Sequence, residues 1–247
     1  MKFILSTMLL SLTMLFQTHL ATAQAFIDLE SGVVFSGYNN VQVPGDAGTR
    51  FSLKTDLSPD PSPFYRARAG YTIKSRHTFS ALYAPLTINS NGSTNFTLAF
   101  AGENFSANSP IEASYTFNSY RLTYRYRLVD QPKFELGLGF SGKIRDAEIS
   151  LKSEGLNASK TNLGFVPLIN FRLHWQPQEK MGILLRGDAL AAPQGRAEDV
   201  MLAGTYNLSE QLRIRAGYRI LEGGADNDEV YNFTLVHYAT VGFSYTL

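Results

Sequence analysis

A two-residue period of apolar and polar positions runs through the segment NSYRLTYRYRLV, residues 118–129. Tyr120 and Leu122 fall on one parity, whereas Arg121 and Thr123 fall on the other. Successive side chains of a β-strand point to opposite faces, so the segment predicts a strand with one apolar and one polar face. The pattern leaves open whether the apolar face lies against a protein core or against lipid.

The same period recurs along most of the chain and predicts about ten strands. Residues of one parity are mainly aromatic or aliphatic, and those of the other are mainly charged, amide or hydroxyl side chains. The alternation is weakest over 77–88. The predicted strands are 26–37, 64–73, 77–88, 118–129, 133–145, 162–175, 181–190, 199–207, 212–220 and 233–247.

Short and long connections alternate between these strands. The short connections lie at 74–76, 129–132, 176–180 and 208–210, and the long or polar ones lie at 38–62, 89–112, 146–161, 191–198 and 222–232. Transmembrane β-barrels have this layout, with an even number of strands, short periplasmic turns and longer outer loops. A sheet that crosses lipid must also close, because unpaired edge groups in hydrocarbon cost several kcal/mol each.

The expected fold is therefore all-β, a transmembrane antiparallel up-and-down β-barrel of about ten strands. Extra strands at 49–56 and 94–101 would raise the number to about twelve without changing the polarity of the turns. A barrel of about eight strands would require the loss of a hairpin. We find no hairpin in the pattern that is a candidate for removal.

The first residues have the organisation of a secretory signal peptide. Lys2 precedes the apolar run ILSTMLLSLTMLF, and the small residues Ala21 and Ala23 follow near a cleavage point. We expect residues 1–23 to form the signal peptide and residues 24–247 to form one barrel domain. The sequence contains no Cys, which argues against a disulfide-stapled fold and against a lipid anchor.

The chain ends on VGFSYTL, in which Val241, Phe243, Tyr245 and Leu247 share one parity. This segment resembles the terminal strand of bacterial outer-membrane β-barrel proteins, which carry an apolar or aromatic residue at the last position and at alternate positions before it. That family usually ends on Phe, so Leu247 departs from its pattern. The resemblance implies location in the outer membrane of a Gram-negative bacterium and insertion by the barrel assembly machinery through the C-terminal strand. It also implies contact with outer-membrane lipid and lipopolysaccharide, and it says almost nothing about activity.

A soluble periplasmic sandwich or lipocalin-like barrel would also show alternation. Aromatic residues make up 13% of the chain, mostly as Tyr and Phe, with a single Trp at position 175. The core of a soluble barrel has little room for so many rings, whereas a membrane barrel places them in girdles at the two lipid interfaces. The aromatic content therefore favours the membrane barrel.

If the apolar parity faces lipid, the opposite parity gives an Arg-rich lumen with a basic ring near the short turns. In one interpretation the arginines pair with acids such as Asp28 and Glu30 and fill the barrel, because eight strands leave room only for side chains. In the other, unpaired cations line a narrow anion-preferring pore. The predicted lumen or anion-contacting residues are Arg66, Arg68, Arg121, Arg125, Arg127, Arg172, Arg213, Arg215, Arg219 and Glu135.

Motifs of catalysis and cofactor binding are missing from the sequence. There is no metalloprotease helix, nucleophile elbow or glycine-rich phosphate loop, so we expect no cofactor and no metal. The lipid-facing parity of His237 leaves one enzymatic alternative, a membrane-embedded lipid hydrolase such as an esterase or lipopolysaccharide deacylase. A hydrolase needs a serine in hydrogen-bond contact with that histidine, and the expected register places none there.

The acidic loop residues Asp226, Asp228 and Glu229 are expected at the outer surface, where divalent ions would bridge them weakly to lipopolysaccharide. The formal net charge of +1 gives no bulk attraction to nucleic acid. We therefore expect a monomeric, non-enzymatic barrel with a structural or surface-interaction role. The sequence does not identify a ligand.

Overall fold

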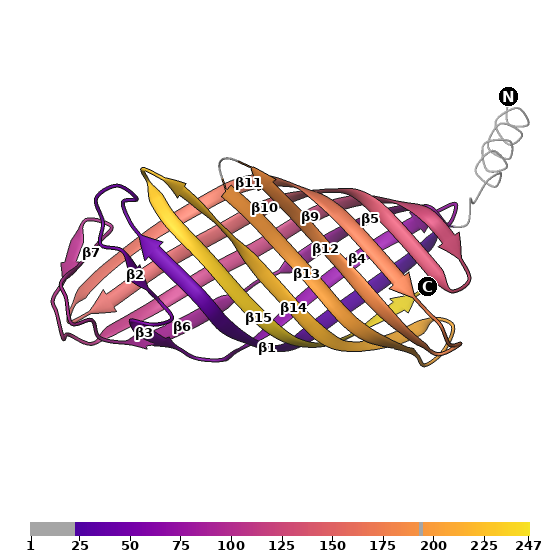
Figure 1. Ribbon diagram of the computed structural model, residues 1–247, viewed down its shortest axis with the longest axis horizontal. Helices are drawn as coiled ribbons and strands as arrows, with labels where there is room; N and C mark the ends of the chain where they lie inside the picture. The colour runs from indigo at the N-terminus through magenta and orange to yellow at the C-terminus, as the bar shows by residue number, and fades with distance from the viewer. Residues whose placement is uncertain (1–22, 193–194) are drawn as a thin grey trace, which may run out of the picture.

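The computed structural model describes residues 23–192 and 195–247, so the expected signal peptide, apart from Ala23, lies outside the described residues. Ten antiparallel strands form a closed barrel, which confirms the predicted fold (Figure 1). Pairing of β1 with β15 closes the wall. The wall strands are β1 (Gln24–Gln42), β4 (Ser62–Ile73), β5 (His77–Ala84) with its continuation β6 (Thr87–Gly92), β9 (Ile111–Gln131), β10 (Phe134–Ser153), β11 (Leu156–Trp175), β12 (Met181–Ala192), β13 (Gly195–Asn207), β14 (Leu212–Asn227) and β15 (Val230–Thr246).

The outer ends of several strands extend beyond the predicted limits. The predicted loop 146–161 is a continuation of β10 and β11, which meet at a tight turn where φ is +44° at Glu154 and +87° at Gly155. The predicted loop 222–232 is likewise mostly strand, in β14 and β15. The prediction of long loops at these places is wrong because both faces of a strand are wetted outside the lipid. Alternation then fades although the hydrogen-bonded ladder continues.

The strand predicted over 77–88 is interrupted at Pro85, between β5 and β6. Proline has no backbone N–H and therefore breaks a ladder. Both pieces pair with β9, so they act as one wall strand with a bend. Among the described residues, no helix is long and apolar enough to span a bilayer.

The outward parity forms an apolar belt, as the sequence predicts. Leu122, Phe140 and Leu163 are 73%, 71% and 75% exposed. Tyr83 and Tyr120 stack on the outside of neighbouring strands, with ring centroids 5.3 Å apart. Exposed apolar surface of this extent is unfavourable in water and is typical of a wall that faces lipid.

The outer end of the lumen is closed by a cap formed from the segments 43–61 and 93–110. The cap contains the short strands β2 (Phe51–Ser52), β3 (Leu57–Pro59), β7 (Leu98–Phe100) and β8 (Glu103–Phe105), and Figure 1 shows β2, β3 and β7 at the end opposite the C-terminus. Phe100 and Phe105 are 1% and 0% exposed in an apolar cluster that includes inward residues of the wall. The segments 49–56 and 94–101 therefore belong to the cap and do not add wall strands.

A second apolar cluster fills the lumen below the cap. Its members come from β1, β4, β6, β14 and β15 and from the bend after β5, so it joins opposite sides of the wall. The cluster consists of Val34, Phe64, Leu86, Ile88, Leu221, Val236 and Tyr238. Apolar clusters therefore occupy two successive levels in the outer half of the lumen.

The wall is incomplete in its outer half, between β11 and β14. β11 pairs with β10 along its whole length but with β12 only over 169–175. The hairpin of β12 and β13 is shorter than its neighbours, and β13 pairs with β14 no further out than Gly224 (Figure 1). Among the described residues, 156–168 of β11 have no strand partner on this side, and Pro167 lies on this edge. We call this break in the wall the lateral gap.

Candidate functional site

A layer of arginines and carboxylates crosses the middle of the lumen. Asp199 on β13 accepts hydrogen bonds from Arg66 at 2.7 Å, from Arg121 at 2.5 Å and from Arg219. All four of these residues are buried. The ion-pair layer consists of Arg66, Arg121, Arg186, Arg215 and Arg219 with Asp28, Glu30, Asp188 and Asp199.

Glu30 on β1 is the second centre of this layer. Its carboxylate accepts from Arg219 at 2.8 Å and from Arg186 and Arg215 at 3.0 Å each. The residues of the whole ion-pair layer come from β1, β4, β9, β12, β13 and β14, so the layer connects opposite sides of the barrel. A guanidinium group presents several donors in one plane and therefore bridges two carboxylates, which explains the use of Arg rather than Lys here.

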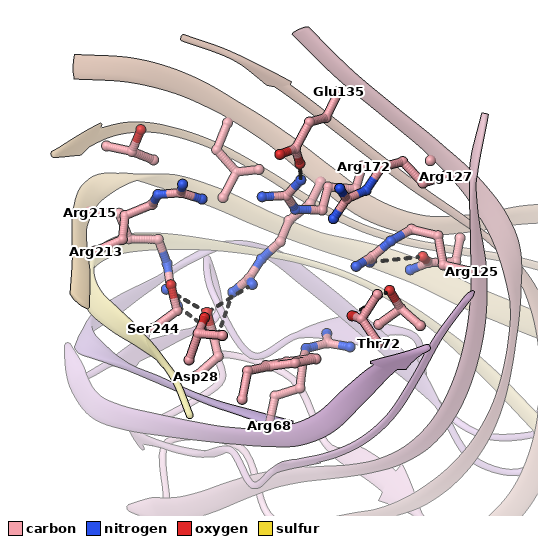
Figure 2. A pocket seen from close by; sticks show the side chains of 18 of the residues that line it. Asp28, Arg68, Thr72, Arg125, Arg127, Glu135, Arg172, Arg213, Arg215 and Ser244 are labelled. Carbon is pink, nitrogen blue, oxygen red and sulfur yellow. Dashed lines mark hydrogen bonds and ion pairs between the residues drawn. The ribbon is translucent and has the colours of Figure 1, made fainter. Parts of the chain in front are cut away.

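A cavity of about 340 Å³ lies between the ion-pair layer and the short-turn end of the barrel (Figure 2). Gln24 and Thr246, at the two ends of the barrel domain, are among its lining residues, which places it at the periplasmic mouth. Its lining holds more guanidinium groups than the local carboxylates balance. We call this cavity the cationic vestibule, and its characteristic residues are Arg68, Arg125, Arg127, Arg172, Arg213 and Glu135.

Most vestibule cations have no acidic partner. Arg172 donates to Glu135 at 2.5 Å, and Arg127 pairs with Asp130, near the end of the same strand, at 3.0 Å. The remaining arginines have neutral partners, namely Ser80 for Arg68 at 3.3 Å, Asn170 for Arg125 at 3.4 Å and Asn207 for Arg213 at 2.7 Å. The Nε atom of Arg68 is buried without any hydrogen-bond partner in the described part of the chain.

The vestibule is chemically suited to hold an oxyanion. A half-buried cation is unfavourable unless negative charge or water compensates it. Guanidinium N–H groups match the geometry of carboxylate and phosphate oxygens, and the cavity volume is in the range of small-molecule sites. A small oxyanion would therefore supply the negative charge that Arg68, Arg125 and Arg213 lack.

The sequence analysis placed all the predicted site residues in one lumen but did not separate an ion-pair layer from a vestibule. Four of the predicted arginines, Arg66, Arg121, Arg215 and Arg219, lie in the ion-pair layer, and the others lie in the vestibule with Glu135. The predicted lumen residues include neither Arg186 nor the acids of the layer, although Asp28 and Glu30 were expected to pair with arginines. Their inward parity was the available signal, but parity does not reveal which strands face each other across a lumen.

The enzymatic alternative rests on His237, and its surroundings contain no nucleophile. Its Nδ1 is hydrogen-bonded to the hydroxyl of Tyr218 across the β14–β15 pair. Ser31 pairs in register with Val241, about 13 Å from the level of His237, and its hydroxyl donates to the backbone carbonyl of Phe64 at 2.7 Å. The described residues thus form no Ser–His contact at this place.

The acidic loop Asp226, Asp228 and Glu229 lies at the β14–β15 turn, at the outer end of the barrel. Glu229 pairs with Lys160 of β11 at 3.1 Å, across the lateral gap. Within residues 23–192 and 195–247, no group of three or more His, Cys, Asp or Glu side chains is arranged to hold a metal ion. The loop therefore presents separate carboxylates rather than a ligand cluster.

Comparison with known proteins supports the fold and does not extend to activity. No family model and no curated protein matches the chain. Among solved structures, the outer membrane protease OmpT from Escherichia coli aligns with a TM-score of 0.55 and 9% identity, covering 91% of this chain and 97% of that one. Ail of Yersinia pestis aligns with a TM-score of 0.39 and 11% identity over 90% and 99%. The translocator domain of NalP from Neisseria meningitidis aligns with a TM-score of 0.38 and 13% identity over 98% and 94%. The chain has the fold of bacterial outer-membrane β-barrels.

Proposed function

We propose that this chain is a non-enzymatic outer-membrane barrel that binds an oxyanion in its periplasm-facing vestibule and does not conduct ions. The observation that carries the proposal is the set of half-buried arginines with neutral partners only. The ion-pair layer has five arginines for its four carboxylates, so it supplies no spare negative charge to these groups.

The packing above the vestibule supports binding over conduction. Beyond the ion-pair layer, a cavity beside Phe64, Leu86 and Tyr238 has a volume of about 10 Å³. This volume is that of about one water probe, so hydrated ions do not fit at this level without rearrangement. The apolar cluster of the cap lies further out on the same axis. A narrow anion-preferring pore, the alternative, would require both levels to open.

Titration with inorganic pyrophosphate tests the vestibule. The refolded barrel in zwitterionic detergent is titrated by calorimetry at low salt, and Arg125→Gln is compared with the wild type. Loss of one charge-assisted hydrogen bond weakens affinity by about tenfold or more. We therefore expect the dissociation constant to rise by at least that factor.

Lys133→Gln is the matched control, because Lys133 is an exposed cation of the β9–β10 turn at the same end and does not line the cavity. We expect this variant to bind pyrophosphate as the wild type does. Equal weakening in both variants would mean that only the general charge of the mouth matters. Absence of binding to the wild type would contradict the proposal.

Export, assembly and surface contacts belong to the same proposal. Residues 1–23 would direct export, and the C-terminal strand with Phe243, Tyr245 and Leu247 would be recognised by the barrel assembly machinery. The protein would function as a monomer, with lipid around the belt and lipopolysaccharide near the loop of Asp226, Asp228 and Glu229. The position of these three acidic residues, at the β14–β15 turn on the outer face, motivates the proposed contact with lipopolysaccharide.

A further inference from the structure

The lateral gap leads into a second cavity, distinct from the vestibule and at the opposite end of the lumen. This cavity has a volume of about 110 Å³, and its lining comes from β9, β10 and β11 on one side and from β13, β14 and β15 on the other. Between those two sides the short hairpin of β12 and β13 leaves the edge of β11 unpaired. The cavity therefore lies behind the break in the wall.

The level of the break is that of the lipid belt. Leu163 and Phe165 of β11 point outward beside the gap and are 75% and 67% exposed. The inward residues of the same stretch, Asn162, Gly164 and Val166, are only half-buried, whereas inward Leu168, at the lower edge of the gap, is buried. The interior is thus accessible from the side at a depth where lipid tails surround the barrel.

Two cations without acidic partners face this cavity. Lys143 is 2% exposed and, among the described residues, makes no hydrogen bond or ion pair; its Nζ lies 4.5 Å from the centroid of the Phe117 ring. Arg145, on the same face of β10, is hydrogen-bonded to the amide oxygen of Asn162, and its Nε is buried without a partner. A buried ammonium group without a counter-charge is unfavourable, so an anion bound here would stabilise the charged form of Lys143.

The other charged residues of the lining are Glu148, Arg196, which pairs with Glu222, and Lys160, which pairs with Glu229. Apolar side chains surround them. Tyr115, Phe117, Ile149, Val166 and Leu221 contribute to its lining. Opposite them the lining includes four small residues beside the gap: Ala197, Gly223, Gly224 and Ala225. Apolar walls around two unpaired cations fit an anionic head group followed by methylene groups.

We propose that the lateral gap admits a single-chain anionic amphiphile from the bilayer, with its carboxylate or phosphate head held by Lys143 and Arg145. The cavity accommodates the head and the first methylenes, and the remaining tail passes beside Leu163 and Phe165 into the lipid. The two cations complement an anionic head group, and the lateral gap opens toward lipid. A peptide strand would instead enter from the outer aqueous side, so an amphiphile fits this opening better than a peptide does. The site is independent of the vestibule, so the two proposals fail separately.

Photolabelling in nanodiscs tests this assignment. The full barrel is placed in phosphatidylcholine nanodiscs with a diazirine-bearing fatty acid, and labelled peptides are mapped by mass spectrometry. We expect label to concentrate at 163–166, 195–198 and 221–225. Competition by oleate and by oleyl phosphate distinguishes carboxylate from phosphate recognition, and neutral monoolein should not compete. Label spread evenly around the belt, for example at Leu122 and Phe140, would overturn the proposal.

Variants separate the head group from the tail. Lys143→Met with Arg145→Gln should lower specific labelling by about tenfold or more, whereas Lys152→Gln, an exposed cation of the same strand, should leave it unchanged. Val166→Phe fills the cavity with both cations intact and should abolish the specific label even if the double variant does not fold. Undiminished labelling in Val166→Phe would contradict the site.

Discussion

At the scale of single residues, position decides what each arginine does. In the ion-pair layer every guanidinium faces at least one carboxylate, as in the contacts of Arg219 with Glu30 and Asp199. In the vestibule, half-buried Arg125 has the same charge but only an amide oxygen as partner, at 3.4 Å. The first kind stabilises the closed barrel, and the second leaves positive charge for a ligand.

Asp199→Asn should be one of the most destabilising single changes in the lumen. It removes the charge that neutralises Arg66, Arg121 and Arg219, and breaking a buried pair by removing one partner costs about 3–5 kcal/mol. Urea unfolding in the presence of lipid vesicles, followed by tryptophan fluorescence, measures the loss in the free energy of unfolding.

Asp130→Asn provides the comparison, because Asp130 pairs with Arg127 on an accessible turn. Exposed ion pairs contribute about 0–1 kcal/mol, so this variant should unfold almost as the wild type does. Similar losses in both variants would show that burial does not determine the strength of the layer.

The sequence predicts which face each of these residues occupies but not its partner. Arg121 and Asp188 both fall on the polar parity, yet they stand on β9 and β12, which are not neighbours in the wall. Contacts across a lumen depend on tilt and closure, and a two-residue period contains neither quantity. The lipid-facing residues need no such information, which is why the belt was predicted correctly.

At the scale of elements, the β12–β13 hairpin ends short of its neighbours β11 and β14 in the outer half of the barrel. The predicted strand positions agree with the wall wherever one face meets lipid, and they stop where water wets both faces, as in the outer part of β10 and β11. The sequence predicted β12 and β13 as strands but did not predict the lateral gap. The gap exists because β11 and β14 extend further out than this hairpin, and the alternation underestimates the lengths of both strands.

The cap should open independently of the wall. Phe100→Ala removes a ring that is 1% exposed in the cap cluster, and such truncations cost about 3–5 kcal/mol. We expect faster proteolysis within 43–61 and 93–110, with unchanged heat-modifiable migration of the barrel on gels. Limited proteolysis of the refolded protein in vesicles measures both.

Phe140→Ala, at a lipid-facing position that is 71% exposed, is the control for the loss of a ring. Cap proteolysis should stay at the wild-type rate in this variant. Loss of heat-modifiable migration in Phe100→Ala would show instead that cap and wall unfold as one unit.

At the scale of the whole molecule, successive levels of packing separate the two ends of the lumen. We expect planar-bilayer recordings of the wild type in KCl to show no steady conductance steps, because the level above the ion-pair layer holds a space of about 10 Å³. Steady anion-selective steps that diminish when Arg125→Ala is combined with Arg215→Ala would contradict a closed lumen and favour the pore.

The β1–β15 seam must close before Asp28 and Glu30 meet their arginine partners. Asp28 and Glu30 belong to β1, and their partners Arg186, Arg215 and Arg219 belong to strands on the other side of the β1–β15 seam. Combining Asp28→Asn with Glu30→Gln should therefore slow the appearance of the heat-modifiable band during refolding into vesicles. Ser31→Ala, an outward change on the same strand, should refold at the wild-type rate.

The same arrangement affects which seam forms. If β1 slipped by two residues against β15, every outward apolar side chain would still face lipid, because strand side chains repeat with a period of two. The slip would displace Glu30 by roughly 7 Å along the strand, beyond the reach of Arg219. The ion-pair layer therefore selects the native register of the seam. It disfavours a misaligned closure that contact with lipid alone would leave equally stable.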